Sequence, residues 1–173
     1  MENIKQRLIN AGGTGMLLPE THARAFLDMF ARQPLSSCGL AIAAGASPSY
    51  KTGNVVYAVA NGKLFSAAAQ TPAVQLTAGV AVPQNQYGVV LIGLDAGGNF
   101  SVYFAGAGAQ LSSAPIPTFP WINPATDQPQ VCVGAIVLAP TSGAFTGGTS
   151  ALDTVGAATF LSFVGPTHPA ALF

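Results

Sequence analysis

From about residue 39 onward, the chain consists of short runs rich in Val, Phe, Tyr and Thr, and turn dipeptides separate these runs at roughly regular intervals. Runs of this kind are typical of β-strands joined by tight turns. The pattern predicts a mainly β fold, a β-sandwich or jelly-roll-like domain of about six to nine strands.

Two pairs of runs predict β-hairpins. Residues 54–60 and 63–68 flank the dipeptide Asn61-Gly62, which tolerates the positive φ angles that a type I′ turn needs. Residues 87–94 and 100–105 flank a glycine-containing loop over residues 95–99. Further strands are expected over residues 74–82, 131–139 and 158–164. The proline-rich stretch 115–129 is expected to cross the surface as a long connection.

The first 38 residues differ from the rest and predict an N-terminal arm with a short amphipathic helix between Pro19 and Gln33. Phe26 and Phe30 are four residues apart, with Leu27 between them, so they share one helical face. Charged residues of alternating type follow at four-residue steps: Glu20, Arg24, Asp28 and Arg32. The organisation expected is therefore an arm over residues 1–38, a β-rich domain over 39–165 and a C-terminal tail over 166–173.

Charge is scarce. Six Lys and Arg balance six Asp and Glu, and only 7% of the residues are charged, against roughly a quarter in an ordinary soluble domain. A neutral chain lacks the positive field that nucleic acid or an anionic membrane surface attracts. No apolar run approaches the roughly twenty residues of a transmembrane helix, and residues 1–10 lack the apolar core of a signal peptide. We therefore expect that the chain binds neither nucleic acid nor a membrane, and that no signal peptide directs its export.

Two apolar runs, residues 89–94 and 131–138, do not alternate with polar residues. Strands of this kind are covered on both faces. One face meets the opposite sheet, and the other needs a helix, a loop or another subunit to cover it. Because a chain with a single short helix has little of its own to place there, the pattern predicts a homo-oligomer. The alternative is that many Ala, Gly, Ser and Thr residues form an uncharged surface that water wets.

The residues that carry chemistry are isolated from one another. His22 and His168 have no histidine or carboxylate at ligand spacing, which argues against a metal site. Asp95, Asp127 and Asp153 stand beside Gly, Pro or Thr, where aspartate commonly serves a turn or a cap. No serine lies in a nucleophile-elbow pattern, and no glycine run continues into a phosphate-binding Lys-Ser/Thr pair. We expect no enzyme, no catalytic residues and no cofactor.

Three further side chains have plain structural interpretations. Cys38 and Cys132 are far apart, in neither a metal nor a redox spacing, and are expected as buried free thiols. Trp121, in the proline-rich stretch, is the one aromatic residue expected at the surface, where its ring could bind a sugar.

Residues 145–153, with the sequence FTGGTSALD, predict a structured loop. Two glycines permit a tight reversal, Thr149 and Ser150 can bond to nearby backbone groups, and Phe145 and Leu152 can hold the ends of the loop in the core. Together with the preceding strand 133–138 and the hairpin over residues 88–98, this loop resembles small virion proteins of tailed bacteriophages, namely capsid decoration (cement) proteins and head-fibre proteins. The resemblance covers roughly residues 54–164.

The resemblance implies a homotrimer of β-rich domains on the outer surface of a phage head, assembled in the host cytoplasm and bound to the major capsid protein. Such a protein would stabilise the head by burying surface. Five residues of the arm are the candidate partner-binding residues: Arg24, Phe26, Leu27, Phe30 and Arg32. Equally, the helix could pack on its own domain.

Two other functions remain open. A trimeric tail-fibre or spike module that binds host surface glycans would show the same β-rich, low-charge sequence, and loss of cell binding in Trp121→Ala would favour it. An enzyme such as a polysaccharide depolymerase would need a carboxylate pair or a group of histidines that converge across strands. We expect that replacing Asp95, Asp127 and Asp153 changes no activity.

Overall fold

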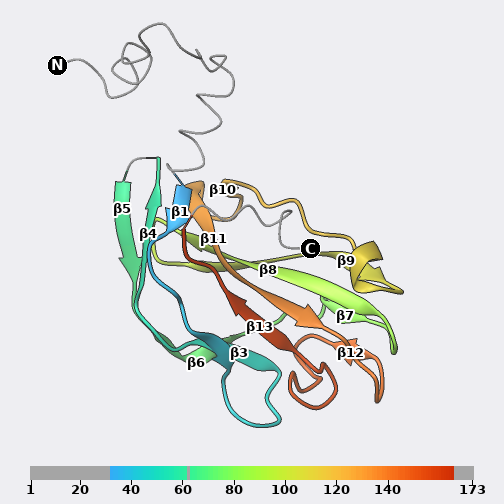
Figure 1. Cartoon of the computed structure of the whole chain (residues 1–173). Helices are drawn as coiled ribbons and strands as arrows, with labels where there is room; N and C mark the ends of the chain where they lie inside the picture. Colours follow the sequence, from blue (N-terminus) through green and yellow to red (C-terminus); the bar gives the residue numbers. More distant parts are fainter. Residues whose placement is uncertain (1–31, 62, 166–173) are drawn as a thin grey trace, which may run out of the picture.

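The structure, a computed structural model, describes residues 32–61 and 63–165, with residues 71–74 described by their backbone alone (Figure 1). Within these residues the chain forms thirteen strands and one short 3-10 helix. They are β1 (Arg32–Pro34), β2 (Leu40–Ile42), β3 (Ser49–Thr52), β4 (Val56–Ala60), β5 (Lys63–Ala67), β6 (Gln70–Gln75), β7 (Ala81–Val82), β8 (Tyr87–Asp95), β9 (Phe100–Gly108), η1 (Leu111–Ser113), β10 (Ile122–Asn123), β11 (Gln128–Leu138), β12 (Phe145–Thr146) and β13 (Thr159–Ser162). The mainly β prediction is confirmed. Five strands have only two or three residues, which leaves eight longer ones within the expected range.

The strands pair antiparallel in several sheets, consistent with a β-sandwich-like fold. The largest sheet has the order β10-β11-β8-β9, with β13 also paired to β11, and it runs through the centre of Figure 1. Two three-stranded sheets, β1-β4-β5 and β2-β3-β6, and the pair β12-β7 complete the described part. In Figure 1, β4 and β5 stand at the left of the molecule.

The main hydrophobic core lies between the inner faces of these sheets. Strand β4 contributes alternate residues, Val56, Ala58 and Ala60, and each is at most 1% exposed. Strand β8 contributes alternate residues to the same cluster, and β11 does so on either side of a register shift between Cys132 and Gly134: Val90, Ile92, Leu94, Val131, Val133, Ile136 and Leu138. Because side chains alternate across a strand, this arrangement sends every intervening residue to an outer face.

Both predicted hairpins are confirmed. Strands β4 and β5 pair from Val56↔Ala67 to Ala60↔Lys63, and Asn61 in the connection has a φ of 52°. A type I′ turn needs this positive φ, and the Asn-Gly dipeptide predicts such a turn because it tolerates that conformation. Strands β8 and β9 pair through the loop that begins at Asp95. The strands expected over residues 131–139 and 158–164 are present as β11 and β13.

Two expectations need correction. Arg32 and Gln33, placed at the end of the predicted helix, belong to β1, which pairs with β4. Sheet pairing there overrides the four-residue periodicity, and the rest of the predicted helix lies outside the described residues. The single strand expected over residues 74–82 is also wrong. A turn closed by the Val80 N–H donating to the Thr77 carbonyl (3.0 Å) separates β6 from β7.

The outer face of β8 and β11 is covered by the chain itself. Val89, Leu91, Cys132 and Ala135 form a second cluster with Phe119 and other residues that follow β9. The proline-rich stretch therefore does more than cross the surface, because its Phe119 packs on this face together with Ala114 and Phe163. Of the three covers considered, the chain's own loops and β13 supply this one, so this face needs no other subunit. The homo-oligomer itself stays a prediction, without the support that this face was expected to give.

The loop over residues 145–153 is structured as predicted. Phe145 and Leu152 are fully buried, and the Thr146 N–H donates to Ser150 Oγ (2.9 Å). A Cβ added at Gly147 would stand 2.1 Å from the Thr77 carbonyl oxygen, so this close backbone approach requires glycine.

Candidate functional site

The strongest candidate for an interaction surface is the outer face of the β1-β4-β5 sheet. Its apolar residues are Leu35, Val55, Tyr57, Val59 and Leu64, and we call them the β4 face. Register places them together: Val59 is opposite Leu64 on β5, and the Leu35 N–H donates to the Tyr57 carbonyl (2.7 Å). They share a face because their neighbours Val56, Ala58 and Ala60 point into the core.

The β4 face is exposed to an unusual degree for apolar side chains. Leu64 is 67% exposed, Tyr57 50%, and Leu35 and Val55 45% each. The charged residues of this sheet, Arg32 and Lys63, both stand opposite Ala60, at the end next to the Asn61 turn. Gln33, opposite Val59, and Ser66, opposite Tyr57, lie on the same face, so its exposed apolar side chains stand among uncharged polar ones. Exposed apolar side chains that gather on one face are the kind of surface that marks an interaction site in a soluble protein.

Arg32 is the only one of the five predicted partner-binding residues that the structure describes. Its Nε donates to Asn61 Oδ1 (3.2 Å), and its guanidinium lies 5.5 Å from the centre of the Trp121 ring. A cation over an aromatic face is attracted by the ring quadrupole. These contacts fix the start of β1 against the Asn61 turn and the Trp121 ring. Arg24, Phe26, Leu27 and Phe30 lie outside the described residues.

Trp121 is less exposed than the sequence suggested. It is half-buried, it packs edge to face with Phe119 (5.4 Å between ring centres), and Arg32 stands over its ring. A sugar platform needs an open aromatic face, and Arg32 occupies one face here. Trp121 instead joins the start of β1 to the connection that covers β8 and β11.

Asp95 is the most heavily hydrogen-bonded acid of the described residues, and it serves two turns. Its carboxylate accepts from the backbone N–H groups of Gly97 and Asn99 (2.9 Å each), within the β8–β9 loop. It also accepts from Asn123 Nδ2 (2.9 Å) and Thr126 Oγ1 (2.6 Å), across the β10–β11 turn. Burial alone would raise the pKa of Asp95, but these hydrogen bonds outweigh burial and lower it.

The other two acids also have structural roles. The Asp153 carboxylate accepts from the Ala46 N–H (2.9 Å), and Asp127 has a φ of 55° in the turn between β10 and β11. The predicted turn role is confirmed for Asp95, and Asp127 lies in a turn, whereas Asp153 joins its loop to the distant Ala46. Among the described residues, no three His, Cys, Asp or Glu side chains are grouped so that they could hold a metal ion.

Gln130 is a buried polar residue that sequence reasoning missed. Its amide oxygen accepts from Ser101 Oγ (2.9 Å), and its amide nitrogen donates to the Pro120 carbonyl and to the Tyr103 hydroxyl (2.8 Å). It therefore fastens the covering connection to β9 and β11. A Gln between Pro129 and a run of apolar residues gives no signal of this role in the sequence.

Cys38 and Cys132 are buried free thiols, as predicted. Burial raises the pKa of both, that of Cys132 to about 12. A thiol that stays protonated is a poor nucleophile and a poor metal ligand, so both cysteines act as packing residues.

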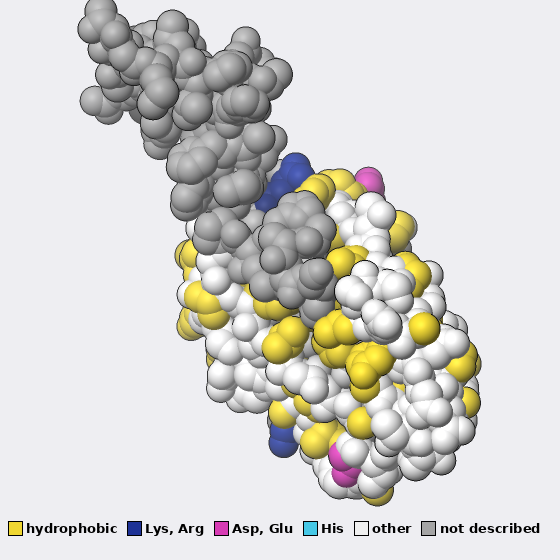
Figure 2. Space-filling model, turned by 45° about the vertical axis from the view of Figure 1, so that its right-hand side comes forward, with side chains coloured by type: hydrophobic (Ala, Val, Ile, Leu, Met, Phe, Trp, Pro, Cys, Tyr) yellow, Lys and Arg dark blue, Asp and Glu magenta, His cyan; other side chains and the backbone are white. Residues whose placement is uncertain are grey.

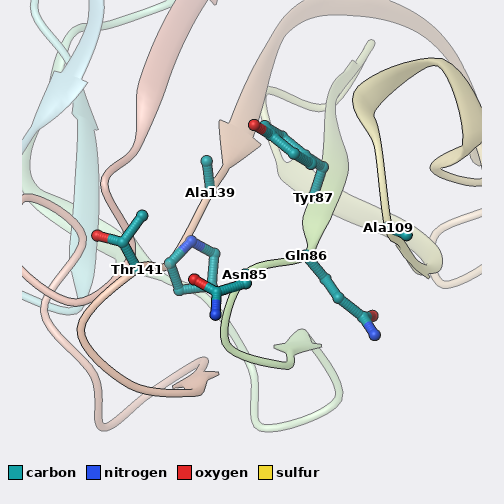
Figure 3. A pocket seen from close by; sticks show the side chains of 7 residues that line it. Asn85, Gln86, Tyr87, Ala109, Ala139 and Thr141 are labelled. Carbon is teal, nitrogen blue, oxygen red and sulfur yellow. The ribbon is translucent and has the colours of Figure 1, made fainter.

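A small open pocket of about 240 Å³ lies where β8 begins and β11 ends. Its seven lining residues carry no charge: Asn85, Gln86, Tyr87, Ala109, Ala139, Pro140 and Thr141. Figure 3 shows Tyr87 and Thr141 on opposite sides, with Ala139 and Asn85 between them. In the described part of the chain, no hydrogen bond involves the side chains of Asn85, Gln86, Tyr87 or Thr141. The pocket could therefore hold a small, neutral, hydroxylated ligand.

Comparison with known proteins found no matching family model, no similar curated protein and no similar solved structure. Over the residues that the structure describes, no helix has the length and apolar character that crossing a membrane would require.

Proposed function

We propose that this chain is a structural virion protein, a capsid decoration or cement protein that binds the outer surface of a tailed-phage head and stabilises it. The observation that carries the proposal is the β4 face, an uncharged sheet surface with large exposed apolar side chains. Figure 2, which shows another side of the molecule, likewise has few charged side chains. The resemblance to virion proteins supplies the head as the partner.

Such a protein acts by binding alone. A ligand that binds only the assembled state stabilises it by mass action, in proportion to the logarithm of its concentration over its dissociation constant. No reacting group is required, which accords with the structural roles of Asp95, Asp127 and Asp153. We further propose a homotrimer bound to the major capsid protein, as the resemblance implies. The β4 face, rather than the outer face of β8 and β11, is the surface available for these contacts.

The test is co-sedimentation of the purified protein with phage heads assembled without it. We expect it to sediment with the heads and to raise the temperature at which they release DNA. Tyr57→Asp combined with Leu64→Asp should abolish both effects, because it places two charges on the β4 face. Ser112→Asp, at an exposed position on η1, is the matched control and should bind normally. Failure of the unaltered protein to sediment with heads would refute the proposal.

The alternative is a fibre or spike module that binds host surface glycans, and the pocket beside Tyr87 favours it. Amide and hydroxyl groups next to an aromatic ring suit a neutral sugar. Asn85→Gly tests it with little strain, because Asn85 already has a φ of 61°. Under this alternative the protein would stain host cells, and Asn85→Gly or Thr141→Val would weaken staining. Trp121→Ala would weaken it only if the half-buried ring also contacts the glycan.

A further inference from the structure

We propose that two copies of this chain pair through the outer edge of β9, so that their largest sheets join into one continuous antiparallel sheet. The inference goes beyond the proposed function and uses no residue of the β4 face. Strand β9 ends the order β10-β11-β8-β9, and of the described strands only β8 pairs with it. Its other side is therefore a place where a further strand can be added.

One hydrogen bond shows which backbone groups of β9 point toward β8. The Asp95 N–H donates to the Asn99 carbonyl (3.0 Å) at the turn of the β8–β9 hairpin. In an antiparallel ladder, hydrogen-bonded pairs recur at every second residue along each strand. Ser101 and Tyr103 therefore exchange hydrogen bonds with β8, and the residues that alternate with them direct their N–H and C=O groups away from it.

The outward groups belong to Phe100, Val102 and Phe104, and we call the backbone of these three residues the β9 edge. In the described part of the chain, no backbone or side-chain group hydrogen-bonds to these outward groups. The regular stretch ends after Phe104, because the pairing with β8 shifts register there and Gly106 has a φ of 126°. The edge is thus a short, regular row of free donors and acceptors.

The β9 edge lacks the features that discourage pairing at other sheet edges, namely charged residues, prolines and very short strands. Strand β5 carries Lys63, β1 carries Arg32 and Pro34, and β10 and β12 have two residues each. Strand β13 is joined to β2, because the Leu40 N–H donates to Ser162 Oγ (2.9 Å). Strand β9 has nine residues, and neither a charge nor a proline is among them.

The β9 edge is complementary to a second copy of itself. In an antiparallel pair centred on Val102, this residue lies opposite the partner's Val102, and Phe100 lies opposite the partner's Phe104. Each of the three residues of the edge then exchanges both of its outward hydrogen bonds with the other chain. Any other register leaves at least one of the three without a partner, so the contact has a single preferred register.

The side chains also match across this contact. Phe100, Val102 and Phe104 pack against the main core but are only partly buried, so the added strand would cover part of what they expose. Valine then meets valine at the centre and phenylalanine meets phenylalanine on either side, and cross-strand pairs of these types stabilise antiparallel sheets. Because β9 has no charged residue, no like charges meet when the strand faces its own copy.

A contact between the same edge of two copies is isologous and closes with two chains. It uses up both edges, so no further strand can add there. The contact is compatible with the homotrimer proposed above, because two rings can pair across two-fold axes.

Amide hydrogen exchange, measured residue by residue over a range of protein concentrations, tests the pairing. At low concentration we expect the amides of Phe100, Val102 and Phe104 to exchange fast, because they point to water. At concentrations where one chain in ten is unpaired, their exchange should be about tenfold slower. The amides of Ser101 and Tyr103, which bond to β8, are the control within the same strand and should be slow throughout. Edge amides whose exchange does not change with concentration would overturn the inference.

Charge-swapped variants test the register. Val102→Lys and Val102→Glu should each stay unpaired, because like charges meet at the two-fold axis. A mixture of the two with different tags should form mixed pairs, since opposite charges then meet. Ala105→Lys, at the exposed position next to the edge, is the matched control and should pair like the unaltered protein. A mixture that stays unpaired while both variants are folded by circular dichroism would overturn the inference, and if a variant fails to fold, the exchange measurement decides.

The pairing and the capsid proposal can fail separately. Tyr57→Asp with Leu64→Asp, which abolishes head binding under the proposed function, should leave the pairing intact. Pairing by a protein that does not bind heads would refute the capsid proposal alone. Edge amides that slow only when phage heads are added would show that the β9 edge takes a strand of another protein, and this outcome would overturn the inference.

Discussion

Strands β8 and β4 both carry apolar side chains on their two faces, yet the chain covers the outer face of only one of them. On β8, Val89 and Leu91 are fully buried in a cluster that contains Phe119 of the connection after β9 and Phe163 after β13. On β4, Tyr57 stays half-exposed and Val59 is only partly buried. The two strands are equally apolar, so the difference arises from where the rest of the chain runs.

The comparison shows that apolar content alone does not identify an interface. The longest apolar runs of the sequence lie in β8 and β11, and they are the most completely buried strands of the protein. The shorter run around β4 is the one that leaves large apolar side chains in water. An association surface is therefore expected where apolar side chains stay exposed after the chain's own loops have packed on its strands.

The largest effect is expected from a charge on the covered face. Leu91→Asp places an unpaired carboxylate in a fully buried site, and the cost of several kcal/mol should prevent folding. Leu64→Asp, on the β4 face, is the matched change and should leave the monomer folded. Circular dichroism and thermal unfolding of both variants measure the contrast. Folding of Leu91→Asp with normal stability would contradict the assignment of this face as covered.

Phe119→Ala removes part of the cover itself. Phe119 is 8% exposed and packs edge to face with Tyr103 and Trp121. We expect a loss of about 3–5 kcal/mol in the free energy of unfolding, as for other buried aromatic residues. The variant should also bind more of an apolar fluorescent dye, because β8 and β11 become accessible. Val55→Ala, on the β4 face, is the control and should lower dye binding or leave it unchanged.

Asp95→Ala tests the hydrogen bonds that join the β8–β9 loop to the β10–β11 turn. The change leaves the donors of Asn123 and Thr126 without their acceptor, and we expect a loss of about 2–3 kcal/mol in denaturant unfolding. Because the pKa of Asp95 is lowered on folding, its contribution is present above the ordinary value of 3.8. It is lost as the pH falls through the lower pKa of the folded state. The stability difference between the two proteins should therefore shrink in acid.

Local patterns were sufficient for the hairpins and the loop over residues 145–153. Asn61 supplies a positive φ, and Phe145 and Leu152 are buried, because these features depend on neighbours in the sequence. The role of Asp95 in a turn was likewise visible from the glycines beside it. Such features need only a few consecutive residues to be specified.

Features that depend on distant segments could not be predicted. Arg32 carries a helical spacing of charges but pairs with Ala60 in a sheet, and Gln130 gives no signal of its bond to Pro120. The β4 face was missed for a related reason. Val55, Val56 and Tyr57 are consecutive apolar residues, and only the position of the core decides which of them face water. The cover over β8 and β11 is a contact of the same long-range kind.

The smallest effect on stability is expected from a polar substitution on the β4 face. Leu64 is two-thirds exposed, so Leu64→Gln removes little buried surface from a single copy. At concentrations where copies are separate, the free energy of unfolding should change by no more than about 0.5 kcal/mol. At higher concentration the unaltered protein should gain stability from association while the variant gains less, since any contact made through the β4 face loses an apolar side chain. Thermal unfolding of both proteins over a range of concentrations measures this. If the unfolding temperature of the unaltered protein did not depend on its concentration, the β4 face would make no contact between copies in solution.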